Sequence, residues 1–190
     1  MLVLLAGLVI FLGVHCVSIV APAWRVAQVA RRGELAWKAV YSLVSALGLV
    51  LIVVGYGLAR REPVVLYVPP AGMRHLALLL MLPVFPLLFA AYLPGRIRRA
   101  AKHPMLLAVK LWALAHLLAN GTLADVLLFG GFLAWAILSF TAARKRDRAA
   151  GKVYPAGTMQ GTIVSVVVGL AIYAAFVMGL HTWLIGVRPV

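Results

Sequence analysis

Long apolar stretches separated by short polar connections follow one another along the whole chain. Six of them are predicted to be membrane spans, at residues 2–22, 37–59, 74–93, 104–120, 122–142 and 160–184. A helix of about 20 apolar residues crosses the hydrocarbon core of a bilayer. Because lipid cannot satisfy free backbone groups, each stretch is expected to be helical. The pattern predicts an all-α polytopic membrane bundle, with residues 1–190 forming a single integral membrane domain.

Two local signals refine this picture of six helices. Pro83 and Pro86 interrupt the third stretch, and each removes a backbone donor, so we expect that helix to kink. The fourth stretch is short, and Asn120-Gly121 leaves almost no connection to the fifth. Stretches four and five are therefore predicted to form a tight helical hairpin.

The net charge of +14 suggests nucleic acid only until its distribution is considered. Thirteen of the eighteen Lys and Arg residues lie in the connections after stretches one, three and five, namely Arg25, Arg31, Arg32, Lys38, Arg96, Arg98, Arg99, Lys102, Arg144, Lys145, Arg146, Arg148 and Lys152. By the positive-inside rule these connections face the cytoplasm. We expect a membrane protein with both termini on the outer side, a lipid bilayer as its partner, and no nucleic acid.

Common catalytic and redox motifs are missing from the sequence. It has one cysteine, which allows no internal disulfide, and it has no CxxC, no glycine-rich phosphate loop and no HExxH. The first stretch lacks the basic start and small-residue cleavage pattern of a secretory signal, so we expect it to be retained. Candidate chemistry must come from polar residues within the membrane.

His15 and His116 are the principal candidates, because both interrupt apolar stretches where polar groups are unfavourable and often functional. Trp112, His116 and Asn120 are spaced i, i+4, i+8 and share one helix face, which indicates either helix packing or one wall of a cofactor pocket. Lys110 is expected to extend its stem toward the basic side. Any of the histidines is alternatively satisfied by groups on a neighbouring helix, and we favour that interpretation for the boundary residues His75, His103 and His181.

Several segments resemble the NnrU family of bacterial membrane proteins. They are "GVHCVSI" (13–19), "WKAVYSLVSALGLVLIVVGYG" (37–57), "MRHLALLLMLPVFPLL" (73–88), "LPGRIRRAAKHPMLLAVKLWALAHLLANG" (93–121) and "GLHTWLIGVRP" (179–189). The resemblance implies a link to denitrification, through expression of nitrite and nitric oxide reductases. It also implies similarity to zeta-carotene isomerase, a membrane enzyme that binds haem b.

For the site, this resemblance implies a haem b held by two histidines. The matching positions are His15 of "GVHC" and His116 of "LAHLL". His75 is a reserve candidate because it lies on the outer side with His116 and next to Arg74. Isomerisation would require an open or displaceable position on the iron. The expected ligand is then a hydrophobic molecule or a small gas such as nitric oxide.

Other residues are implied around such a haem. Its propionates would pair with Arg74 at the outer side, or with Arg25 and Lys110 at the inner side. The second nitrogen of a ligating imidazole would need an acceptor, either a backbone carbonyl or Asn120.

Two other functions are weighed against a haem protein. The segment "KHPMLLAVKLWALAHLLANG" is similar to the "RHPxYxG" region of isoprenylcysteine carboxyl methyltransferases, which bind S-adenosylmethionine. Here Leu106 replaces the tyrosine, Ala108 replaces the glycine, and the acidic tail of those enzymes is missing. The third interpretation is a non-catalytic assembly or sensing partner of denitrification enzymes.

Overall fold

The computed structural model describes residues 1–189, and these form an all-α bundle. Its helices are α1 (Leu2–Val20), α2 (Pro22–Arg32), α3 (Glu34–Ala59), α4 (Met73–Met81), α5 (Val84–Ala90), α6 (Arg96–Ala101), α7 (Pro104–Ala119), α8 (Leu123–Ala149), α9 (Met159–Ala175), the π-helix η1 (Phe176–Leu180) and α10 (His181–Ile185). Over residues 1–189 the only β pairing consists of two isolated bridges, Val65 with Thr122 and Gly95 with Thr158.

Five helical segments are long and apolar enough to cross a membrane: Leu2–Val20, Glu34–Ala59, Met73–Ala90, Leu123–Ala149 and Met159–Ile185. The sixth apolar helix, α7, has 16 residues. At about 1.5 Å per residue it is roughly 24 Å long, less than the roughly 30 Å hydrocarbon core. These six segments match the six predicted stretches, with the fourth the short one. The chain is a multi-pass membrane protein.

Two predicted boundaries differ from the structure. The connection after the first span is the helix α2. Its Trp24 ring packs edge-on against the Trp37 ring, with the ring centroids 5.7 Å apart. The fifth helix does not end at residue 142 but continues to Ala149 through a run rich in arginine, lysine and alanine. These are good helix formers in water. The apolar pattern marks only the part of a helix that lies in lipid, and this helix continues beyond that part.

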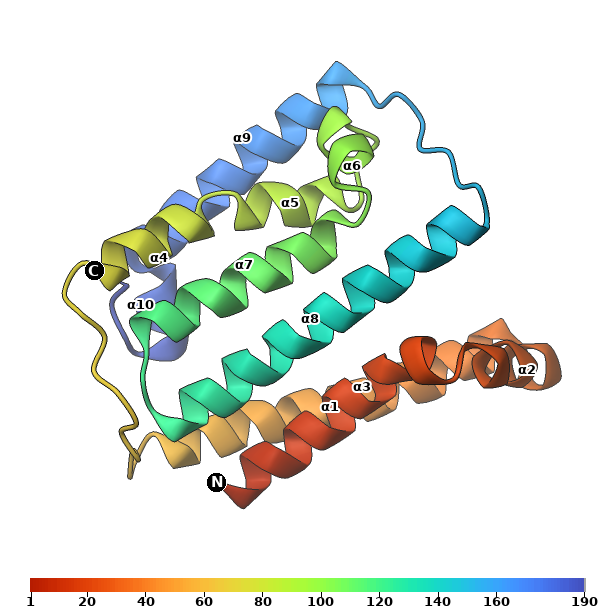
Figure 1. The fold of residues 1–190 in the computed structure, drawn as a ribbon. Helices are drawn as coiled ribbons and strands as arrows, with labels where there is room; N and C mark the ends of the chain where they lie inside the picture. The colour runs from red at the N-terminus through yellow and green to blue at the C-terminus, as the bar shows by residue number, and fades with distance from the viewer. Residues whose placement is uncertain (190) are drawn as a thin grey trace.

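Figure 1 shows the order in which the long helices pack. α1 lies along α3, and α8 lies beside α1 on one side and α7 on the other. The α4–α5 segment covers α7, and α9 packs against α5. α8 therefore lies between α1 and α7. The connections that hold the basic residues are at one end of the bundle, whereas both termini and the 60–72 segment are at the other.

Glycines allow α1 and α3 to approach each other backbone to backbone. A Cβ atom built on Gly55 would lie 2.3 Å from the backbone nitrogen of Leu4, and one on Gly7 would lie 2.6 Å from that of Ile52. Helices in lipid associate largely through such close packing, because apolar burial there has no driving force relative to lipid. The α1–α3 pair therefore depends on these positions having no side chain.

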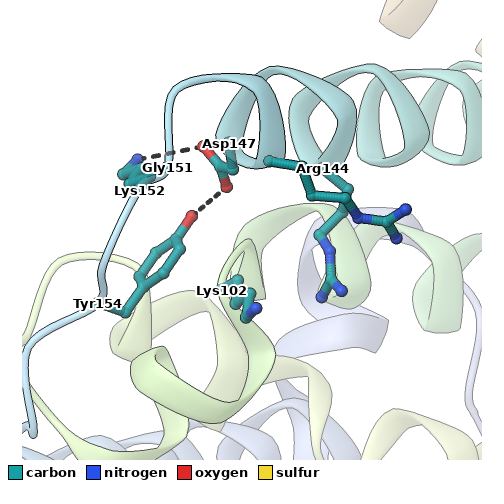
Figure 2. A pocket seen from close by; sticks show the side chains of 7 residues that line it. Lys102, Arg144, Asp147, Gly151, Lys152 and Tyr154 are labelled. Atoms are coloured by element: carbon teal, nitrogen blue, oxygen red, sulfur yellow. Dashed lines mark hydrogen bonds and ion pairs between the residues drawn. The ribbon is translucent and has the colours of Figure 1, made fainter.

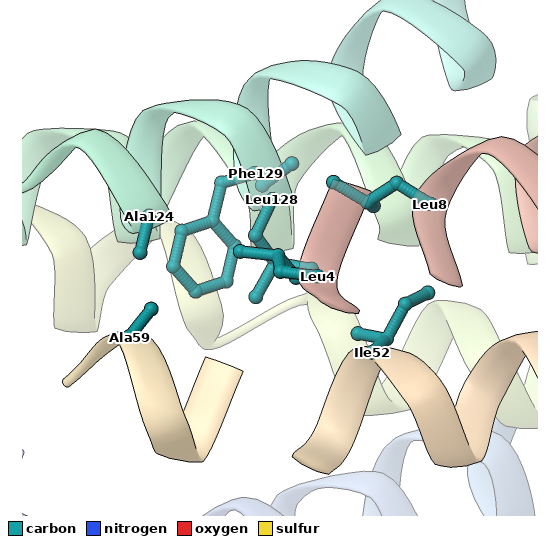
Figure 3. Close-up of a cluster of buried hydrophobic side chains, with 8 residues drawn as sticks. Leu4, Leu8, Ile52, Ala59, Ala124, Leu128 and Phe129 are labelled. Atoms are coloured by element: carbon teal, nitrogen blue, oxygen red, sulfur yellow. The ribbon is translucent and has the colours of Figure 1, made fainter. Parts of the chain in front are cut away.

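The buried apolar cluster lies where α8 meets this pair (Figure 3). Its members come from α1, α3, α7 and α8 and are Leu4, Leu8, Ile52, Ala59, Ala113, Ala124, Leu128 and Phe129. The cluster sits toward the end of the bundle that holds the N-terminus, because Leu4 and Ala124 are each near the start of their helices. Through Phe129 it also supports the candidate site.

The predicted kink and hairpin are both confirmed. The third span breaks between α4 and α5 at Pro83, and Pro86 then packs against α9, where a Cβ on Gly169 would be 2.4 Å from the Pro86 nitrogen. The α7–α8 turn at Gly121 is held by the 62–68 segment: the Gly121 carbonyl accepts from Leu66 N at 2.8 Å. A Cβ there would overlap the Tyr67 carbonyl.

Candidate functional site

His116 lies in an aromatic layer between α7 and α8, near the end of the bundle that holds the termini. Its ring stacks on Phe129 with centroids 4.6 Å apart and is 5.3 Å from the Trp112 ring. Nδ1 donates to the Trp112 carbonyl oxygen at 2.8 Å. Because the carbonyl can only accept, the proton resides on Nδ1, and Nε2 keeps its lone pair.

The residue that faces His116 is His181. The two ring centroids are 6.5 Å apart, and the rings are inclined by 31°. His181 Nδ1 donates to the Val187 carbonyl oxygen at 2.7 Å, so this imidazole has the same tautomer. Among the described residues neither Nε2 atom has a hydrogen-bond partner. The chain thus presents two imidazoles with available acceptor nitrogens.

The end of the last span positions His181. The helix changes from α to π over Phe176–Leu180 immediately before it, and α10 ends at Gly186, which has a left-handed φ of 77°. The Arg60 guanidinium at the end of α3 donates to the Ile185 carbonyl at 2.8 Å and ties α10 to the bundle. Within this stretch Gly179 has a non-helical backbone (φ 174°, ψ −25°), so the last span is kinked just before His181.

His15 lies elsewhere, on α1. Its Nδ1 donates to the Phe11 carbonyl at 2.6 Å, and its ring stacks on Phe11 with centroids 4.2 Å apart. A series of ring contacts leads from Phe11 to α7. The Phe11 and Phe132 ring centroids are 5.6 Å apart, and those of Phe132 and Trp112 are 5.5 Å apart. The described ring contacts therefore pair His116 with His181 rather than with His15. The role of His15 as a ligand stays a prediction.

The neighbours predicted on the face of His116 have distinct contacts. Trp112 packs on the His116 ring and also supplies the carbonyl that orients it. The Asn120 side chain donates from Nδ2 to the His116 carbonyl at 2.9 Å. Two acceptors are predicted for the second imidazole nitrogen, a backbone carbonyl and Asn120. The structure shows the backbone carbonyl in this role, whereas Asn120 donates to a carbonyl at the end of α7.

The predicted cations are spread over both ends. The Lys110 ammonium lies 3.8 Å from the centroid of the Phe140 ring, on the side of His116 toward the basic end. Arg25 is exposed on α2 at that end. Arg74 and His75 are exposed in the first turn of α4, at the end that holds the termini.

Sequence reasoning missed a buried carboxylate next to this layer. Asp125 is only 5% exposed and accepts from the Tyr56 hydroxyl at 2.5 Å and from the Thr122 hydroxyl at 2.6 Å. Thr122 and Asp125 together form a capping box at the start of α8. The spacing of Thr122 and Asp125 directly after Asn-Gly was the available signal. Tyr56 meets Phe129 edge-on at 6.4 Å and so connects α3 to the stacking partner of His116.

The donor set limits which metals suit the site. Within residues 1–189 there is no group of three or more His, Cys, Asp or Glu side chains that could hold a metal ion. The arrangement around His116 provides two imidazoles in an apolar surrounding instead. That donor set is suited to a metal whose other ligands come from a cofactor.

Comparison with known proteins identifies the family of this chain. The family model described as NnrU protein matches residues 3–189. The chain belongs to the NnrU family. No curated protein and no solved structure matches the chain. The NnrU match includes every helix of the bundle and all five histidines, so the site around His116 and His181 lies wholly inside the family's domain.

Proposed function

We propose that this NnrU-family protein binds haem b within the membrane, with His116 and His181 as axial ligands. The observation that supports this most is the 6.5 Å separation of the two rings. A metal–imidazole bond is about 2 Å long, and the nitrogen lies about 1 Å from the ring centroid, so one metal shared by two rings separates them by roughly 6 Å. In donor type and in ring separation, the two imidazoles match that requirement.

The chemistry of the donors favours haem over a bare metal ion. A structural zinc takes four protein ligands, and catalytic zinc takes three. Paired axial imidazoles are instead a haem arrangement, since the porphyrin supplies the remaining ligands. Phe129 and Trp112 make the surroundings apolar, as a macrocycle requires.

Cations for the propionates are present at the same end of the bundle. Arg188 and Trp183 line an open surface hollow of about 620 Å³ beside α10. Arg74 is exposed at the start of α4. Either guanidinium can pair with the propionate carboxylates. This supports propionates that face the outer side, rather than the inner side with Arg25 and Lys110.

Haem iron, when bound, supplies redox chemistry and a position for small ligands. The protein's own contribution is orientation: the carbonyls of Trp112 and Val187 hold the Nδ1 protons and leave each Nε2 free for the metal. We assign the protein to the nitrite and nitric oxide metabolism that the family resemblance implies. Isomerase-like chemistry on a hydrophobic substrate is the second candidate. Binding of nitric oxide or of such a substrate to the iron requires one of the two histidines to leave it.

An absorption spectrum of the purified protein in detergent tests the proposal. We expect a Soret band that shifts on reduction, with the pyridine adduct identifying haem b at about one per chain, since two axial ligands define one iron. Protein expressed with added haem precursor but isolated without any Soret band would overturn the assignment.

We expect no binding of S-adenosylmethionine, the cofactor of the alternative methyltransferase function. The tyrosine and glycine of its motif are Leu106 and Ala108 here, and the His103 imidazole is already engaged with Asp147 at 2.7 Å. Isothermal titration calorimetry should show no heat of binding at micromolar cofactor. A micromolar dissociation constant would restore the methyltransferase interpretation.

We further propose that the protein resides in the bacterial inner membrane with both termini in the periplasm. The basic connections gather at one end of the bundle, and cytoplasmic loops are the ones rich in lysine and arginine. Alkaline phosphatase fused after the C-terminus should therefore be active. A fusion within the basic connection at Gly151 is the matched control and should be inactive. The reverse pattern would invert the topology.

A further inference from the structure

A second polar cluster, on the basic end of the bundle, is not used by the proposed haem site. The His103 Nε2 and Asp147 Oδ2 atoms are 2.7 Å apart, and the Tyr154 hydroxyl donates to the same Asp147 oxygen. Lys152 Nζ lies 3.5 Å from Asp147 Oδ1. Figure 2 shows Asp147 at the end of α8, reached by Tyr154 and Lys152 from the following connection. Both carboxylate oxygens are therefore occupied.

Tyr154 stays a hydrogen-bond donor in this cluster. Burial, together with its bond to Asp147, raises the pKa of Tyr154 to about 12. The hydroxyl is protonated throughout the neutral range, because a raised tyrosine pKa favours the neutral form. The single acid of the cluster thus remains paired with tyrosine, histidine and lysine.

Cations without a carboxylate partner surround this occupied acid. A hollow of about 140 Å³ is lined by Lys102, Arg144, Asp147, Arg148, Gly151, Lys152 and Tyr154. Among the described residues Lys102, Arg144 and Arg148 form no salt bridge. Four basic side chains thus line one hollow in which the one carboxylate is already shared. The site carries an excess of positive charge.

The backbone of Lys102 adds to this picture. Its φ of 61° makes it the one residue other than glycine with a positive φ in the part of the chain that the structure describes. Such a conformation is uncommon for a residue with a Cβ and has an energetic cost of about 1 kcal/mol or more. It places the Lys102 ammonium 5.9 Å from the centroid of the Tyr154 ring, at the hollow. Residues held this way concentrate at functional sites.

We propose that this hollow binds a phosphate group, either of an anionic phospholipid headgroup or of free phosphate. A hollow of about 140 Å³ has room for more than a single water molecule. That suits a tetrahedral oxyanion. Arginine binds phosphate in a bidentate manner through its planar fork, and lysine adds a point charge. The site also lies at the basic end of α8, just past the apolar part of that helix.

Thermal unfolding of the full-length protein in a neutral detergent tests this site. Inorganic phosphate is titrated in one arm and dihexanoylphosphatidic acid in the other, at constant ionic strength set by sodium chloride. A ligand that binds only the folded protein raises its melting temperature in a saturable way. We expect a saturable rise for the wild type. The Arg144→Gln/Arg148→Gln variant should require roughly tenfold more ligand or more, because it loses two charge-assisted contacts.

The matched control is Arg31→Gln/Arg32→Gln on α2, which makes the same charge change at the same end of the bundle but outside the hollow. It should respond like the wild type. A rise with inorganic phosphate identifies free phosphate as sufficient, whereas a rise only with phosphatidic acid identifies the lipid headgroup. Equal responses in all three proteins, or no saturable response in either arm, would overturn the proposal.

Discussion

Replacing His116 with alanine should abolish the Soret band of the protein purified with haem. His116 lies inside the aromatic layer, where Phe129 and Trp112 fix its ring and the Trp112 carbonyl fixes its tautomer. Removing the imidazole leaves the iron without its most strongly positioned ligand. The comparison requires equal amounts of folded protein, measured by size-exclusion chromatography.

Imidazole added to His116→Ala distinguishes ligation from packing. If His116 ligates the iron, free imidazole at millimolar concentration should enter the space left by the side chain and restore the band. A residue that only fills space would give a destabilised protein that imidazole does not rescue. An unaltered spectrum of His116→Ala would show that this histidine is not a ligand.

The same spectra identify the second ligand. We expect His181→Ala to shift the Soret band toward a five-coordinate form, because His181 is the imidazole that faces His116. His103→Ala is the matched control, since that ring contacts Asp147 and Tyr154 at the basic end and should leave the spectrum unchanged. If His15→Ala shifts the band and His181→Ala does not, the ligand pair implied by the sequence resemblance is correct and our assignment of His181 is wrong.

Replacing Gly55 with valine should destabilise the bundle severely. A Cβ at this position would lie 2.3 Å from the Leu4 nitrogen and 2.6 Å from its Cα, and backbone atoms cannot rotate away as a flexible side chain can. α1 and α3 would have to separate, which loses packing along their whole contact. Overpacking of a core typically costs about 1–3 kcal/mol, and a backbone clash belongs at the upper end. We expect the melting temperature in detergent to fall by roughly 6 °C or more.

Gly57→Val is the control for this experiment, because it is on the same helix with nothing within 4 Å of its Cβ position. Both variants gain the same helix propensity when valine replaces glycine, so their difference isolates the contact with α1. Gly57→Val should melt within about 2 °C of the wild type. Similar losses in the two variants would mean that α1 and α3 are not packed backbone to backbone.

The pattern of apolar residues alone was enough to determine the membrane spans and their order along the chain. A span requires a certain apolar length, so six spans, with a short fourth, can be read directly from the sequence. The break at Pro83 and the turn at Asn120-Gly121 also depend on local chemistry, namely a missing backbone donor and a residue pair that favours turns. The gathering of charge at one end results from where the basic residues lie between spans.

Contacts between distant segments needed the tertiary structure. The position of a residue along a helix encodes its depth in the membrane, but the direction of its side chain around the bundle depends on which helices become neighbours. His15 and His116 are suitable in depth, yet α8 lies between their helices. The sequence favours helix packing for His181 because this residue lies at the boundary of the last apolar stretch, and the kink at Gly179 that precedes it is not evident from the apolar pattern. Asp147 and Tyr154 meet only because the connection after α8 folds back on the helix end, and no periodicity in the chain specifies how a connection folds.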